Sequence, residues 1–180
     1  MSTPHTSSKQ AQWFAIKTRQ DLRAEQALTQ VCDEVLYLRE TVRLPGGKTR
    51  LRPVIPHVLF IKATHEDALA LEAAGRRAQP GAVPMWIYRY PDSGDIQVIP
   101  QRSIDLLRLL TADDTARCSV YTPREFKVKE RVRVTGGLYK GYEGYVKRVD
   151  KNKHVIVRIE GVCMVILPYI HPDLLAPLPE

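Results

Sequence analysis

A glycine-punctuated loop between two strand-like runs is the feature that most constrains the fold of this chain. Segment 132–149 has the sequence VRVTGGLYKGYEGYVKRV, in which valines alternate with polar residues on both sides of the glycines. Alternation with a period of two is typical of a half-buried β-strand. Gly136, Gly137, Gly141 and Gly144 permit the positive φ angles and close backbone approaches of a compact loop. The segment therefore predicts two strands joined by a loop.

The residues between these glycines are apolar or aromatic. Leu138, Tyr139 and Tyr142 can close the mouth of a small barrel or present a binding surface. Runs at 154–160 and 162–168 predict two more strands after the loop, and Leu174 and Leu175 can add a fifth. Short strands at this spacing favour a small closed barrel, because closure leaves no exposed edge.

The N-terminal part alternates between strand and helix patterns. Strands are predicted at 13–18, 35–44, 54–62, 85–90 and 96–99, with 54–62 as a central strand. A first helix is predicted from Thr18 and Asp21, with Ala24, Ala27, Leu28 and Val31 on one face. A second starts at Thr64 and ends at Gly75, and a third follows Pro100. This order predicts an α+β domain with helices packed on a mostly antiparallel sheet.

Basic residues gather around the turn Pro45-Gly46-Gly47. The chain carries a net charge of +7, which favours an acidic partner such as nucleic acid. Arg19 and Arg23, near the start of the first helix, are also candidates for contact with a phosphate backbone. The predicted nucleic-acid-binding residues are Arg19, Arg23, Arg43, Lys48, Arg50 and Arg52.

Composition also predicts how the chain is divided. Segment 1–12 is small and polar and is expected to be a disordered leader, not a signal peptide. Segment 113–124 shows no periodicity, so we expect a linker between a domain at 13–112 and a domain at 125–178. No apolar run approaches the ~20 residues that span a bilayer. We expect a soluble, cytoplasmic and monomeric protein that does not bind membranes.

The glycine loop resembles the KOW motif of NusG-type transcription factors and some ribosomal proteins. The matching residues are Val132-Arg133-Val134, Gly137, Tyr139, Tyr142, Gly144 and Val146. From Trp13 to about Pro177 the chain resembles a NusG-like protein, an NGN domain followed by a KOW domain with an SH3-like barrel. The N-terminal match rests on Trp13-Phe14, on the segment from Pro56 to Phe60, and on the helix after Pro100.

The resemblance implies a transcription elongation or antitermination factor. Such a factor binds the β′ clamp helices of RNA polymerase through its NGN domain and suppresses pausing or termination, with non-template DNA nearby. Its KOW domain recruits a further partner, Rho or a ribosomal small-subunit protein. By resemblance the polymerase-binding residues are Trp13, Phe14, Val58 and Phe60, and the KOW partner-binding residues are Gly137, Leu138, Tyr139, Tyr142 and Gly144.

A shorter resemblance concerns the C-terminal run GVCMVILPYIHPDLL, Gly161 to Leu175. It is similar to the ending of NusG-like antiterminators that serve polysaccharide-biosynthesis operons. This implies a specialised paralogue, with a general elongation factor as the alternative.

Two other classes of protein, enzymes and RNA-binding modules, are alternatives to this expectation. Among enzymes, the sequence lacks a nucleophile elbow, a zinc-protease motif or paired carboxylates, so we expect no enzymatic activity, no cofactor and no metal. Among binding modules, a KOW-type RNA-binding or ribosome-associated protein is the alternative. There, Tyr139 and Tyr142 would stack on bases while Lys140, Lys147 and Arg148 contact phosphates.

Overall fold

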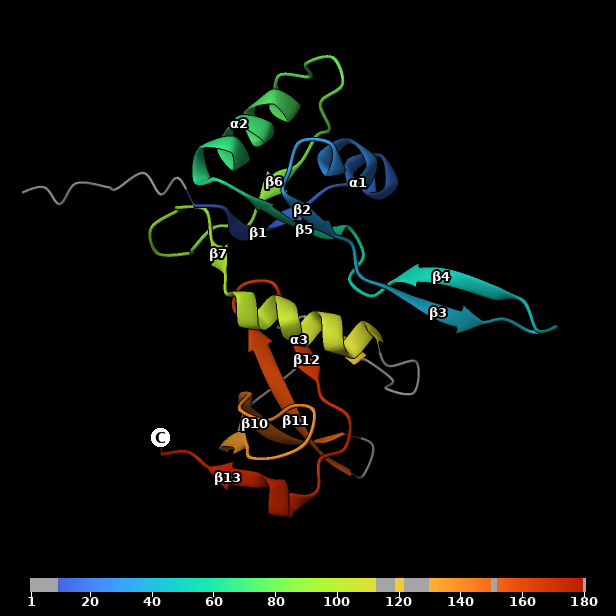
Figure 1. The fold of residues 1–180 in the computed structure, drawn as a ribbon, viewed down its shortest axis with the longest axis vertical. Helices are drawn as coiled ribbons and strands as arrows, with labels where there is room; N and C mark the ends of the chain where they lie inside the picture. Colours follow the sequence, from blue (N-terminus) through green and yellow to red (C-terminus); the bar gives the residue numbers. More distant parts are fainter. Residues whose placement is uncertain (1–9, 113–118, 122–129, 150–151, 180) are drawn as a thin grey trace, which may run out of the picture. The chain divides into compact units, whose positions relative to one another are not determined.

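The computed structural model describes residues 10–112, 119–121, 130–149 and 152–179. The chain divides into two compact units, one comprising the residues up to Arg39 together with Ile55–Gln101, the other comprising Glu40–Val54 and the residues from Arg102 onward. Both contribute to an α+β architecture (Figure 1). The predicted domain limits stay predictions, and most of the predicted leader lies outside the described residues.

An antiparallel sheet forms the centre of the first unit. The first strand of the chain, β1 (Gln12–Lys17), is its inner strand. It pairs on one side with β5 (Val58–Ala63), which pairs in turn with β2 (Glu34–Leu36). On its other side β1 pairs with two short strands, β6 (Trp86–Ile87) and β7 (Val98–Ile99). The predicted mostly antiparallel sheet with helices is confirmed.

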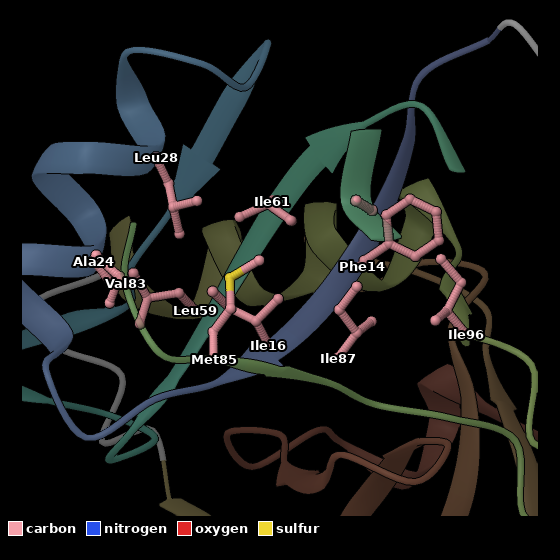
Figure 2. Packing of buried hydrophobic residues seen from close by; sticks show 11 residues of the cluster. Phe14, Ile16, Ala24, Leu28, Leu59, Ile61, Val83, Met85, Ile87 and Ile96 are labelled. Carbon is pink, nitrogen blue, oxygen red and sulfur yellow. The ribbon is translucent and has the colours of Figure 1, made fainter. Parts of the chain in front are cut away.

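Two helices, α1 (Asp21–Thr29) and α2 (His65–Arg76), cover one face of this sheet. Figure 2 shows the resulting core, in which Phe14 and Ile16 of β1 and Leu59 and Ile61 of β5 point towards the helices. All four side chains are fully buried. Because strand side chains alternate between faces, every second residue of β1 and β5 belongs to this core.

The ends of the helices differ from the sequence prediction in two places. Helix α1 ends at Thr29, so Val31 lies beyond it and is 63% exposed. Helix α2 is capped by Thr64 as predicted, but it continues through Gly75 to Arg76. A Cβ at Gly75 would lie 2.3 Å from the carbonyl oxygen of Val83. This glycine therefore allows the close approach of a neighbouring segment and does not end the helix.

The predicted strand 35–44 is two strands. Its first part is β2 in the sheet, and its second part is β3 (Arg39–Arg43), which pairs with β4 (Thr49–Pro53) as a separate two-stranded hairpin. The predicted turn joins them, with Gly46 and Gly47 at φ of 86° and 78°. Leu44 N–H donates to the carbonyl of Lys48 over 2.7 Å across the base of the turn.

The second unit contains a six-stranded antiparallel sheet in the order β13-β9-β10-β11-β12-β8. The strands predicted around the glycine loop are confirmed, including the fifth strand near Leu175. In the part of the chain that the structure describes, β8 and β13 are the outer strands of this sheet and do not pair with each other, so the predicted closed barrel is not observed there. The bounds are β8 (Ser119–Tyr121), β9 (Arg131–Val134), β10 (Glu143–Val149), β11 (Asn152–Ile159), β12 (Cys163–Ile166), the 3₁₀ helix Pro172–Leu174 and β13 (Leu175–Pro177).

Two segments before this sheet bear on the predicted linker. Helix α3 (Gln101–Ala112) is confirmed, with Ile104, Leu107 and Leu110 buried as expected. Most of 113–124 lies outside the described residues, but Ser119–Tyr121 form β8 and pair with β12. Strand β8 was not predicted, because three residues are too few to show a period.

Candidate functional site

The face of the N-terminal sheet that points away from α1 and α2 carries most of the predicted polymerase-binding residues. In the β1–β5 register Ala15 lies opposite Phe60 and Lys17 lies opposite Val58, and directly paired residues share a face. Trp13 lies on this face two residues before Ala15. Phe14 points the other way into the core, so Trp13 and Phe14 do not share a surface, and their role in binding polymerase stays a prediction. We call the surface that carries Trp13, Ala15, Val58 and Phe60 the Trp13 face, and these four side chains are buried.

Charged and polar partners surround Trp13 on the Trp13 face. Its indole Nε1–H donates to Gln101 Oε1 over 2.9 Å, and the Lys62 Nζ lies 5.9 Å from its ring centroid. Lys62 also forms a 2.8 Å ion pair with Glu34. Trp13, Val58 and Phe60 are themselves buried. They therefore shape this face, and its accessible part must come from neighbouring residues.

Trp86 provides that accessible part and was missed in the sequence. It pairs with Lys17 in β6, so it shares a face with Phe60 and Val58, and half of its surface is exposed. Its neighbours Met85 and Ile87 point into the core. The alternation Met85-Trp86-Ile87 could have indicated that Trp86 points to the opposite face, but a run of three apolar residues conceals that period.

A hydrogen-bonded cluster next to α1 has a structural role. Pro56 and His57 form a turn closed by Val58 N–H on the Ile55 carbonyl, and His57 has a φ of 66°, which is unusual for a residue with a side chain. Asp21 accepts hydrogen bonds from the His57 backbone N–H over 3.3 Å and from the Tyr37 hydroxyl over 2.8 Å, and its carboxylate lies 3.1 Å from His57 Nδ1. The cluster thus holds the turn that precedes β5.

The titration properties of this cluster follow from the same contacts. Burial favours the neutral carboxyl of Asp21, but the hydrogen bonds from Tyr37 and His57 outweigh it and lower the Asp21 pKa. Burial, followed by the hydrogen bond to Asp21 and its negative charge, raises the pKa of Tyr37. Both groups therefore keep their ordinary ionisation states at neutral pH. No nucleophile is among these contacts.

The predicted KOW partner loop is only partly available. Tyr139 is buried in the second unit, whereas its neighbour Leu138 is 61% exposed. Gly137 is exposed with a φ of 75°. Gly144 is buried, and a Cβ there would lie 2.3 Å from the carbonyl oxygen of Ile156. The predicted group thus divides into two exposed residues, Gly137 and Leu138, and residues that pack inward.

Tyr142 is half-buried against the first turn of α3. Its hydroxyl donates to the Arg102 carbonyl over 3.2 Å, and the Arg102 guanidinium lies 4.9 Å from its ring centroid. Burial and the nearby charge of Asp105 raise the pKa of Tyr142, although the Arg102 charge opposes them. The neutral phenol is therefore favoured, and its ring is engaged by an internal cation.

The predicted nucleic-acid-binding residues lie in two groups. Arg19 and Arg23 are exposed near α1, where Arg23 donates to the Gln20 side chain over 3.0 Å. The other four belong to the β3–β4 hairpin. Arg52 is paired with Glu40, but among the described residues no ion pair involves the remaining three. These exposed cations of the hairpin are Arg43, Lys48 and Arg50.

The described residues include two free cysteines, Cys32 and Cys163. Burial, with the negative charges of Asp33 and Asp67, raises the pKa of the Cys32 thiol to about 11, so it stays protonated at neutral pH. Cys163 is buried, and Cys118 lies outside the described residues. Within the described ranges no group of three or more His, Cys, Asp and Glu residues could hold a metal ion. Nor does any helix there have the length and apolar character to cross a membrane.

No protein-family model matches this chain, and no curated protein matches it either.

Proposed function

We propose that this chain is a NusG-like transcription elongation or antitermination factor. In this proposal the N-terminal domain binds the β′ clamp helices of RNA polymerase and suppresses pausing or termination. The C-terminal domain is a KOW domain with an SH3-like barrel that recruits a further partner. The proposal includes the finer possibility of a specialised paralogue serving polysaccharide-biosynthesis operons, which rests on the run from Gly161 to Leu175.

The observation that carries the proposal is the exposed Trp86 beside the buried residues of the Trp13 face. Trp13 and Phe60 form its buried aromatic floor, and Trp86 adds an exposed indole on the same side. Lys17 is exposed opposite Trp86. Exposed aromatic side chains over a packed floor are the usual anchors of a protein interface. Such a face suits an apolar helical partner with acidic residues at its margin, as the clamp helices of the proposal require.

The action of such a factor requires no chemistry. A protein that binds the elongating conformation of polymerase more tightly than the paused conformation shifts the population towards elongation. The differential affinity sets the size of the shift, and about 1.4 kcal/mol changes the ratio tenfold.

The proposed KOW partner would meet an exposed surface around Gly137 and Leu138. Leu138 presents an apolar side chain at a loop whose backbone is held by the inward-packed Tyr139. An exposed apolar residue on a fixed loop is a plausible anchor for Rho or a ribosomal small-subunit protein. Tyr142 would join this surface only after leaving Arg102, so a variant at Leu138 tests the KOW partner most directly.

The proposal is tested by titrating the full chain against a bacterial RNA polymerase. Trp86→Ala removes the exposed indole of the Trp13 face, and we expect about tenfold weaker binding. Leu22→Ala is the matched control, because Leu22 is a similarly exposed large apolar residue on α1, whose helix covers the opposite face of the sheet. The control should bind as the unaltered chain does.

Transcription through a pause site and through a terminator completes this test. The unaltered chain should shorten the pause and increase read-through, and Trp86→Ala should require about tenfold more protein for the same effect. If polymerase does not bind the chain, the proposed membership of the NusG-like family fails. If polymerase binds but Trp86→Ala and Leu22→Ala behave alike, the proposed binding face is refuted.

An RNA-binding or ribosome-associated KOW protein is the alternative function. The observation in its favour is the exposure of Lys140, two residues after Leu138, and of Arg148 in β10. Its stacking component has less support, because Tyr139 is buried and Tyr142 is engaged by Arg102. Retention of structured RNA by the full chain, without polymerase binding, would favour this alternative.

A further inference from the structure

We propose that the β3–β4 hairpin binds the phosphate backbone of duplex DNA, independently of base sequence, through Arg43, Lys48 and Arg50. This inference rests on the proposed function only in choosing DNA, the duplex that a polymerase-bound factor meets. It goes beyond that function by assigning the contact to three side chains and by excluding the other arginines of the region.

Internal ion pairs separate the available cations from the neutralised ones. Segment 40–54 contains four basic residues and a single acidic one, Glu40. Glu40 accepts from Arg52, with Arg52 Nε at 2.9 Å. Just outside the segment, Arg39 pairs with Glu25 of α1. The carboxylates of the region are therefore directed at Arg39 and Arg52, and the positive charge that remains belongs to the other three basic residues.

The register of the hairpin places these three cations on both of its faces. Leu44 bonds across to Lys48, and Glu40 contacts Arg52, so Val42 lies opposite Arg50. Side chains of a strand alternate between faces. Lys48 and Arg50 therefore share one face, and Arg43 lies on the other. A ribbon with cations on both faces can meet two phosphate strands at once, as it would between the strands of a duplex groove.

The tip of the hairpin allows close approach to a backbone. Gly46 and Gly47 have positive φ, and a Cβ at either would meet no atom within 4 Å. All residues from Arg43 to Arg52 are exposed. The major groove of B-DNA is wide enough to admit a two-stranded β-ribbon. The hairpin in Figure 1 is such a ribbon, built of β3 and β4 alone.

The composition of the hairpin favours duplex over single-stranded nucleic acid. Proteins that bind single strands stack bases on aromatic side chains. Segment 40–54 contains no aromatic residue, and its exposed apolar side chains are Leu44 and Leu51. Asn and Gln, which read adenine edges, are also missing from the segment. We therefore assign phosphate contact to these cations, and the comparison of duplexes of unrelated sequence tests whether they also read guanine edges, as arginine and lysine can.

The test measures binding of the full chain to a fluorescently labelled 30-base-pair DNA duplex by anisotropy, between about 20 and 200 mM KCl. Three phosphate contacts at about 0.9 each predict a slope of about −2.7 for the logarithm of the binding constant against the logarithm of salt concentration. The variant Arg43→Gln/Lys48→Gln/Arg50→Gln should bind at least tenfold more weakly at the lowest salt, with a correspondingly shallower slope.

A control variant separates the hairpin from net charge. Arg77→Gln/Arg108→Gln/Lys153→Gln removes three exposed cations from other elements and lowers the net charge equally. It should bind the duplex as the unaltered chain does. Unchanged far-UV circular dichroism establishes that both variants are folded. Equal losses in the two variants would overturn the proposal in favour of a general charge effect, and loss in the control alone would transfer the contact elsewhere.

Two further probes define the ligand and keep the proposals apart. Duplexes of unrelated sequence should bind equally, and a single strand of equal length should bind more weakly; the reverse preference, or a preference for an RNA duplex, would overturn the assignment. The hairpin variant should still bind RNA polymerase. Failure of polymerase binding with retained duplex binding would refute the proposed function alone, whereas the opposite result would refute this inference alone.

Discussion

The hairpin at 40–54 and the loop at 136–144 each contain glycines with positive φ between two neighbouring strands. Both also carry basic residues. In the loop at 136–144 the aromatic side chains turn inward, where Tyr139 is buried and Tyr142 rests against Arg102. In the hairpin at 40–54 the tip and the free cations remain exposed. The difference follows from the aromatic residues, which gain free energy by burial, whereas charged side chains do not.

Replacing adjacent residues of the loop should give the largest contrast. Tyr139→Ala removes a buried aromatic ring and should lower the free energy of unfolding of the second unit by about 3–5 kcal/mol. Leu138→Ala removes a side chain that is 61% exposed and should cost about 0.5 kcal/mol or less. Urea unfolding followed by circular dichroism measures both. Similar losses in the two variants would mean that the loop does not divide into inner and outer residues.

A pair of glycine substitutions compares the two regions directly. Gly144→Ala places a Cβ 2.3 Å from the Ile156 carbonyl oxygen, and the backbone shift should cost about 3 kcal/mol. Gly47→Ala meets no atom within 4 Å and suffers only from its φ of 78°, for which about 1 kcal/mol is expected. Thermal unfolding gives the order of the two effects, and the reverse order would contradict the packing at Gly144.

The contact of Tyr142 with α3 should have a pH signature. Because the folded-state pKa of Tyr142 is raised, its stabilising contribution is complete below the unfolded-state pKa of about 10 and is lost as pH rises through the folded-state pKa. Tyr142→Phe also removes the hydrogen bond to Arg102 and should cost about 1 kcal/mol at pH 8. Urea unfolding should show that the difference in free energy of unfolding between the variant and the unaltered chain is smaller above pH 10 than at pH 8. A constant difference would argue against the raised pKa.

The smallest effect is expected in the hairpin. Arg50→Gln should change the free energy of unfolding by no more than about 0.5 kcal/mol, because Arg50 is exposed and no described residue forms an ion pair with it. Arg133→Gln in β9 is the matched substitution, since Arg133 forms a 2.6 Å ion pair with the exposed Glu143. Thermal unfolding measures both variants. Melting temperatures equal to that of the unaltered chain would show that neither surface arginine stabilises the fold.

Long alternating segments were predictable from the sequence, and short or shared ones were not. Strands β1, β10 and β11 have enough residues to display a period, and β5 is marked by its near-continuous apolar run. Strand β8 has three residues, and β2 and β3 share one continuous apolar-polar run that divides between two sheets. The division depends on which partner strand each half meets, and a local pattern contains no information about that partner.

A local pattern also failed to predict which face of the sheet single side chains occupy. The sequence identified Trp13 and Phe60 but also included Phe14, because adjacent aromatic residues do not indicate which one faces the helices. Trp86 was missed for the same reason, since both of its neighbours are apolar. Which basic residues of the hairpin region are paired depends on Glu25, which pairs with Arg39, and on Glu40, which pairs with Arg52. The Glu25–Arg39 contact joins two different elements, so a local pattern does not predict it.

The inner position of β1 has a consequence for synthesis on the ribosome. Residues 12–17 leave the exit tunnel before any of their three partner strands, and the last of these, β7, ends at Ile99. Until then Phe14 and Ile16 have no completed core in which to pack. The nascent N-terminal unit therefore carries an exposed apolar segment of the kind that chaperones bind, and it completes its fold only after nearly a hundred residues have been translated.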